Sequence, residues 1–137
     1  MNREELQRVA TTKLQDADLL FVHGRFSNSY YLFGYAVEIA LKARLARYFR
    51  ADFIPDKKFV NDIYTHNLSR LVELSGLQFE LRDEQRRSPR FNAHWSTVSD
   101  WSENARYDMI DQFSAAAMRN AVAGEQDGVF EWLRNRW

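Results

Sequence analysis

The sequence predicts an all-α protein, a bundle of about five helices with some shorter helical pieces. No segment alternates apolar and polar residues as a half-buried strand would, whereas several segments repeat apolar residues every three to four positions. The segment from Ser27 to Arg50 is apolar on all sides over its first four turns, so it needs neighbours in several directions. The 137 residues suit a single domain spanning 1–137.

Composition narrows the possible functions. Nineteen basic residues balance nineteen acidic ones, so no overall field attracts nucleic acid or anionic lipid, and such binding would need a local patch. Without cysteine, the chain has no disulfide or thiolate site, and its three scattered histidines predict no metal centre and no cofactor. The charged N-terminus and the absence of a long apolar run predict a cytoplasmic protein with no membrane partner.

Two long helices are predicted to open the chain. From Arg3 to about Val22 the apolar residues share one face, and His23 and Gly24 end this amphipathic helix. The central helix from Ser27 to Arg50 follows after a short link, with Ser27 or Ser29 as its N-cap. A link this short makes the two helices antiparallel.

One face of the central helix carries both charges of its apolar part. At about 100° per residue, Tyr31, Tyr35, Glu38 and Lys42 fall within roughly 60° of one another. Glu38 and Lys42 are spaced for an ion pair within the helix, and Arg106 is the expected distant partner of the carboxylate. Two interpretations remain open: an ion-pair network that docks later helices, or the floor of a cleft that binds nucleotide or phosphate.

Shorter elements are predicted downstream. Residues 51–64 contain Pro55 and predict a loop or a short turn, after which Thr65 caps a helix that ends at Gly76. A helix from Phe79 to Arg87, ended by Ser88 and Pro89, precedes a short element that contains His94, Trp95, Val98 and Trp101. The inward residues of the first of these helices are Leu68, Leu71 and Val72.

Two further helices complete the prediction. Asp108 to Ala123 forms one, with Met109, Phe113, Ala116 or Ala117, and Val122 facing inward. Asp127 caps the last piece, whose apolar residues are Val129, Phe130, Leu133 and Trp137.

His66 lies in the first predicted turn after Thr65, where the helix dipole disfavours a charged imidazole. A neutral ring could accept a proton, and Arg70, one turn later, could hold a phosphate beside it. A capping or packing role for His66 is the alternative. Arg82, Arg86, Arg87 and Arg90 form the densest basic patch, with Phe91 and Trp95 nearby as stacking surfaces, although a solvated helix face is the more common explanation of such a run.

Several segments resemble a known family. GRFSNSYYLFGYAVEIALKARL, THNL, Trp101 with Arg106 and Tyr107, and GVFEWLRNRW are similar to bacterial HEPN (higher eukaryotes and prokaryotes nucleotide-binding) proteins over nearly the whole chain. The resemblance implies an up-and-down helical bundle that forms a homodimer. It also implies RNA or a nucleotide as ligand, and a place in a defence or toxin–antitoxin module, with a nucleotidyltransferase as possible partner protein.

Several HEPN proteins are metal-independent RNases that use an Arg and a His a few residues apart, with Arg holding the scissile phosphate and His moving protons. Only Arg87 and His94 match that order and spacing here, and Pro89 between them interrupts the helix that would fix their geometry.

Three hypotheses follow. The first is a HEPN-like binding or regulatory protein for RNA or nucleotide. The second is an endoribonuclease that uses His66 with Arg70, or Arg87 with His94. The third is a structural interaction module whose exposed aromatic residues bind a protein partner.

Overall fold

The computed structural model describes all 137 residues and contains helices and connecting segments but no strand. Five helices have ten or more residues: α1 (Arg3–Val22), α2 (Phe26–Leu45), α5 (Gln78–Arg87), α6 (Pro89–Ser99) and α7 (Gln112–Ala123). The shorter elements are α3 (Lys57–Asp62), α4 (Leu68–Leu74), α8 (Val129–Arg134) and the 3₁₀ helices η1 (Ala46–Tyr48) and η2 (Glu103–Tyr107). The predicted all-α bundle is confirmed.

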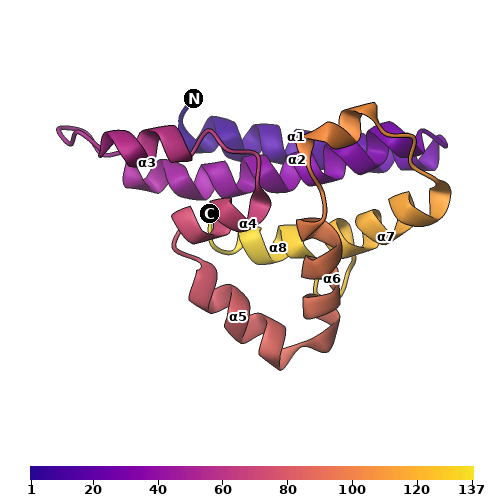
Figure 1. The fold of residues 1–137 in the computed structure, drawn as a ribbon. Helices are drawn as coiled ribbons and strands as arrows, with labels where there is room; N and C mark the ends of the chain where they lie inside the picture. The colour runs from indigo at the N-terminus through magenta and orange to yellow at the C-terminus, as the bar shows by residue number, and fades with distance from the viewer.

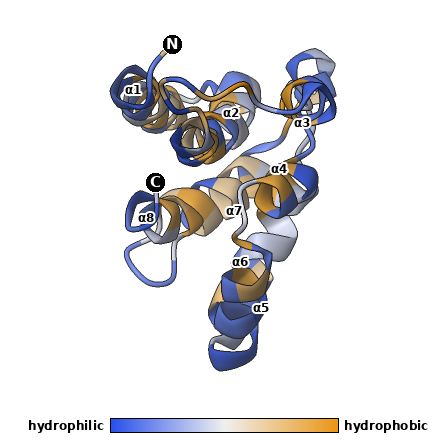
Figure 2. Cartoon of the chain, turned by 90° about the vertical axis from the view of Figure 1, so that its left-hand side faces the viewer, coloured by the Kyte–Doolittle hydropathy of each residue, from blue (hydrophilic) through white to orange (hydrophobic).

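The two 20-residue helices α1 and α2 form a long antiparallel pair along one side of the molecule (Figure 1). Helices α7 and α8 lie on the other side of α2, while α5 and α6 extend away from the long pair as a V-shaped arm (Figures 1 and 2). None of the helices combines the length and apolar character that crossing a lipid bilayer requires.

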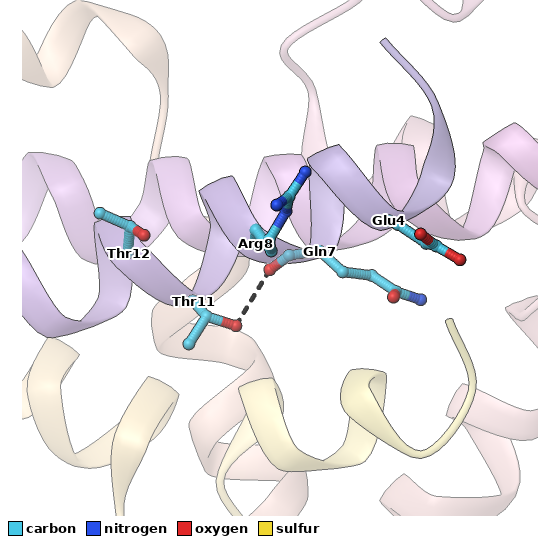
Figure 3. Close-up of a pocket in the computed structure, with 5 residues that line it drawn as sticks. All are labelled: Glu4, Gln7, Arg8, Thr11 and Thr12. Atoms are coloured by element: carbon cyan, nitrogen blue, oxygen red, sulfur yellow. Dashed lines mark hydrogen bonds between the residues drawn. The ribbon is translucent and has the colours of Figure 1, made fainter.

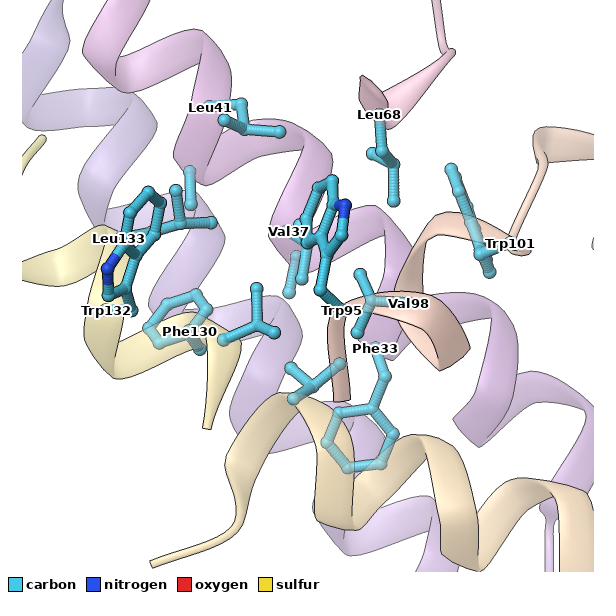
Figure 4. Packing of buried hydrophobic residues seen from close by; sticks show 14 of the residues in the cluster. Phe33, Val37, Leu41, Leu68, Trp95, Val98, Trp101, Phe130, Trp132 and Leu133 are labelled. Atoms are coloured by element: carbon cyan, nitrogen blue, oxygen red, sulfur yellow. The ribbon is translucent and has the colours of Figure 1, made fainter. Parts of the chain in front are cut away.

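The core surrounds α2, as predicted. A single cluster of 26 buried apolar residues draws on every helix except α3 and η1. Figure 4 shows Phe33, Val37 and Leu41 of α2 among side chains from α4, α6 and α8. Each large apolar side chain fully removed from water stabilises the fold by roughly 1.5–3 kcal/mol before entropic costs, so the enclosure of α2 dominates stability.

The start of α2 differs from the prediction, because neither Ser27 nor Ser29 caps it. The helix begins at Phe26 after Arg25, which provides no side-chain cap. The Ser29 hydroxyl donates to the Ala17 carbonyl at 2.8 Å and ties α2 to α1. Ser27 Oγ accepts from the Ile110 amide at 2.9 Å. Tertiary partners thus replace the local capping bond in both cases.

Other helix starts also differ. Asn67, not Thr65, caps α4, since its side chain accepts from the Arg70 amide at 2.9 Å. Gly128, not Asp127, precedes α8, because Asp127 adopts a left-handed conformation with φ of 57° and contributes no cap. Helix α7 begins only at Gln112 and buries Ala115, Met118, Ala121 and Val122. Met109 precedes the helix and Phe113 is on its exposed side, so both were wrongly placed in the core and are 94% and 84% exposed.

Candidate functional site

The charged face of α2 forms the centre of the candidate site. Glu38 is only 2% exposed, and Lys42 Nζ donates to its Oε1 at 2.9 Å. The predicted ion pair within the helix is therefore present. Since a buried carboxylate needs several donors, a further partner is expected close to Glu38.

That partner is His66. Its Nδ1 lies 2.9 Å from Glu38 Oε1 and 3.1 Å from Oε2, and its Nε2 lies 3.1 Å from Oε2 of Glu103 in η2. The expectation that Arg106 would pair with Glu38 was wrong: the Arg106 guanidinium lies over the Tyr107 ring, 4.8 Å from its centroid. One histidine thus links the buried acid of α2 to an acid on η2.

The surroundings of His66 differ from those of a neutral helix-terminus histidine. Because Asn67 is the N-cap, His66 precedes α4 and is outside its first turn. A neutral imidazole has one N–H, whereas here both ring nitrogens face carboxylate oxygens. The doubly protonated ring fits both contacts. The predicted interaction with the helix dipole is absent, and the basis for a neutral base at this position is lost.

The segment 100–111, which joins α6 to α7 and contains η2, crosses this face of α2 and is called the strap below. Burial raises the pKa of Tyr30 on α2, and the strap residues Asp100 and Asp108 raise it further. Trp101 is 3% exposed, and its ring centroid is 6.0 Å from that of Tyr31. The strap therefore covers part of the face on which the sequence had suggested a ligand site.

Gly34 makes the close approach of the strap possible. A Cβ atom built at Gly34 would lie 2.2–2.3 Å from three atoms of the Trp101 ring. Sequence reasoning missed this contact. The available signal was a single glycine inside the otherwise apolar run of the central helix, which is a common sign of close packing against the backbone.

Beside Trp101, aromatic side chains remain partly open to solvent. Tyr31 and Tyr35 are stacked, with ring centroids 5.9 Å apart and an interplanar angle of 13°. Tyr107 is 75% exposed, and its interaction with Arg106 raises the pKa of that guanidinium, with a smaller contribution from Glu103. Stacked rings beside an exposed cation can hold a planar anionic ligand such as a nucleotide.

The pair Arg87 and His94 is not assembled for catalysis. His94 is 8% exposed, its Nδ1 donates to the Asp127 carbonyl at 2.8 Å, and its Nε2 accepts from Asn120 Nδ2 at 3.3 Å. Arg87 pairs with Glu84 within α5. Both nitrogens of His94 thus have internal partners, which link α6 to α7 and to the segment before α8.

The pair His66 and Arg70 is not assembled either. Arg70 donates to Glu73 at 2.9 Å and to Asp62 at 3.0 Å. These contacts raise the pKa of Arg70, while Lys58, and after it Arg70, lower the pKa of Asp62. The guanidinium that was expected to hold a phosphate beside His66 is thus occupied by two carboxylates.

Two hollows of the surface lie away from the α2 face. One is a shallow, entirely polar depression on α1, where the side chains spread along the helix (Figure 3) and the Thr11 hydroxyl donates to the Gln7 carbonyl at 3.0 Å. A second lies along α5 and includes Arg86 and Arg87 of the predicted basic patch, together with Glu80 and Asp83. Adjacent acids offset the arginines there, so the patch carries little net positive charge.

Comparisons with known protein families, with curated proteins and with solved structures each find no match.

Proposed function

We propose that the chain is a HEPN-like helical protein that binds RNA or a nucleotide without cleaving it, as the binding or regulatory member of a prokaryotic defence or toxin–antitoxin module. The HEPN assignment rests on the sequence resemblance. One observation carries the binding role: the stacked, partly exposed Tyr31 and Tyr35 on α2, with the Arg106 guanidinium on the adjoining strap.

The proposal combines a stacking surface with a nearby cation. Aromatic rings bind bases through their faces with little dependence on base identity, while an arginine attracts the phosphate. Lys42 adds little, because its ammonium group already pairs with Glu38. The internal contacts of His66, Arg70, Arg87 and His94 favour binding over catalysis.

Tyr35→Ala and Arg106→Ala are each expected to weaken binding of a fluorescent single-stranded RNA by roughly tenfold, because each removes one stacking surface or one phosphate contact. Fluorescence anisotropy at two salt concentrations measures the effect. Arg106→Ala should also reduce the salt dependence. The same RNA incubated with the protein in chelator should stay intact.

The matched controls lie at the other end of α2. Phe53 is 60% exposed in the loop before α3, and Arg50 precedes it. Phe53→Ala and Arg50→Ala should bind RNA as the wild type does. Equal losses in the control and test variants would contradict binding at the α2 face, and RNA cleavage abolished by His66→Ala would show that the protein is a nuclease instead.

A protein-interaction role is the second candidate, because exposed apolar side chains gather where α1 turns into α2. The Arg119–Asp18 ion pair and the Ser27–Ile110 contact bring α7 and the strap to this turn. We call the set the end patch: Leu19, Val22, Tyr107, Met109 and Phe113, which are 57–94% exposed. Clustered apolar surface of this kind is characteristic of protein interfaces, and we propose a second copy of the chain as its partner.

Replacing both Met109 and Phe113 with aspartate is expected to convert a homodimer into a monomer, since two charges would have to be buried in the interface. Light scattering across a concentration series measures the mass. Phe79→Asp, at a 74% exposed position on α5, is the control that should leave the dimer intact. A wild-type protein that stays monomeric throughout the series would rule out the homodimer.

A further inference from the structure

The strap is held against the bundle by the burial of Trp101 and Ala105 and by two polar contacts. Trp101 is buried against Gly34, Glu103 meets His66, and the Ile110 amide donates to Ser27. Only the contact of Glu103 with His66 joins two ionisable side chains. We propose that His66 is a pH-dependent clasp: its protonated ring ties Glu103 to the buried Glu38, and loss of one ring proton releases Glu103 and loosens the start of η2 while Trp101 and Ala105 stay docked.

The order of release follows from burial. Glu38 is 2% exposed and has only Lys42 and His66 as hydrogen-bond donors, so its carboxylate retains the ring N–H at Nδ1. When the ring is neutral, Nε2 carries a lone pair. That lone pair then faces Oε2 of Glu103 across 3.1 Å, and the contact changes from attractive to repulsive.

The consequence is local, because Glu103 has an alternative. Its side chain is 39% exposed and can turn into water, whereas Trp101, at 3% exposure, remains in the core. Ala105 of η2 is also buried, at 4% exposure, so release loosens the turn from Ser102 to Ala105 without unfolding the bundle. A partly exposed contact of this kind changes an opening equilibrium by roughly threefold to fivefold.

The other charges near His66 do not replace Glu103. Lys42 shares Glu38 with the ring from the α2 side, and Arg106 is on η2 next to Glu103. Behind His66, the charges of α3 and α4 pair among themselves: Lys58 with Asp62, and Arg70 with Asp62 and Glu73. Glu103 is thus the carboxylate whose contact with the ring depends on the proton at Nε2.

The substitution Glu103→Gln tests the effect of the proton at His66 Nε2. The amide can accept from a protonated Nε2 or donate to a bare one, so its contact with His66 survives at either charge. Hydrogen exchange of the Ala105 amide, which bonds to the Ser102 carbonyl across Glu103, measures release. Taking the ratio of the two proteins at each pH removes the intrinsic pH dependence of exchange.

As the pH is raised from about 5 to about 8, protection of the Ala105 amide in Glu103→Gln relative to wild type is expected to rise roughly threefold to fivefold. The same ratio measured in a His66→Gln background should not vary with pH. Glu73→Gln, an acid at a similar exposure that pairs with Arg70, should give a pH-independent ratio to wild type.

A constant ratio for Glu103→Gln, or a pH-dependent ratio that persists without His66, would overturn the clasp. These measurements involve no ligand. Their outcome is therefore separate from the outcome of the RNA-binding experiments.

Discussion

Gly34→Ala is expected to destabilise the protein by about 2–3 kcal/mol, even though alanine is the better helix former. The added methyl would lie 2.2–2.3 Å from atoms of the Trp101 ring, so the ring would have to move. The better helix propensity of alanine would offset somewhat less than about 1 kcal/mol of this loss in the free energy of unfolding. The loss of Trp101 packing is the larger effect, because this ring is almost completely buried.

Urea denaturation followed by circular dichroism measures the change, and a double-mutant cycle assigns it. In a Trp101→Leu background, which removes most of the ring, Gly34→Ala should have a much smaller effect or become stabilising. If Gly34→Ala lowers the free energy of unfolding equally in both backgrounds, Trp101 is not the side chain that excludes the added methyl. Ala117→Gly on the exposed face of α7 serves as a control for helix propensity alone.

The contact between Gly34 and Trp101 also shows what sequence periodicity can and cannot predict. The apolar pattern of α2 reports which residues are buried, because burial of Phe33, Val37 and Leu41 is a property of the helix itself. It does not report what covers them. The sequence places Trp101 in a short element after Pro89, but its partner Gly34 is 67 positions away and no local pattern encodes the pairing.

Helix starts were less predictable than helices, for a related reason. A serine or threonine before an apolar run is a capping signal only if no tertiary partner competes for its hydroxyl. Ser29 bonds to α1, and Ser27 accepts from the strap. Met109 and Phe113 fit a helical pattern, yet Met109 lies between η2 and α7, and α7 buries the face that carries Ala115 and Met118 and leaves Phe113 exposed.

In the candidate site, the ion pair within α2 could be predicted because its members are four residues apart. The contacts of His66 with Glu38 and Glu103 span 28 and 37 positions and depend on how the segment before α4 and the strap cross α2. Arg106 was the expected partner of the buried Glu38 carboxylate. Because the strap contacts Glu38 through His66, Arg106 remains on the surface beside Tyr107.

Glu38→Leu is the second substitution with a large expected effect, a loss of about 2–3 kcal/mol in the free energy of unfolding. Lys42 and His66 both pair with the Glu38 carboxylate, which is 2% exposed. The substitution removes this shared partner and leaves both side chains beside a leucine. The expected loss is below that of a fully buried pair, because the Lys42 side chain is 25% exposed and can reach water.

Adding Lys42→Leu should recover much of the loss and bring stability to within about 1 kcal/mol of the wild type, since an apolar pair avoids the desolvation of both charges. Urea denaturation at one pH compares the single and double variants. Glu73→Leu, which removes an exposed carboxylate from Arg70, should change stability little. A double variant less stable than Glu38→Leu would show that Lys42 has a favourable partner other than Glu38, and that the ion pair is not the reason for the buried charge.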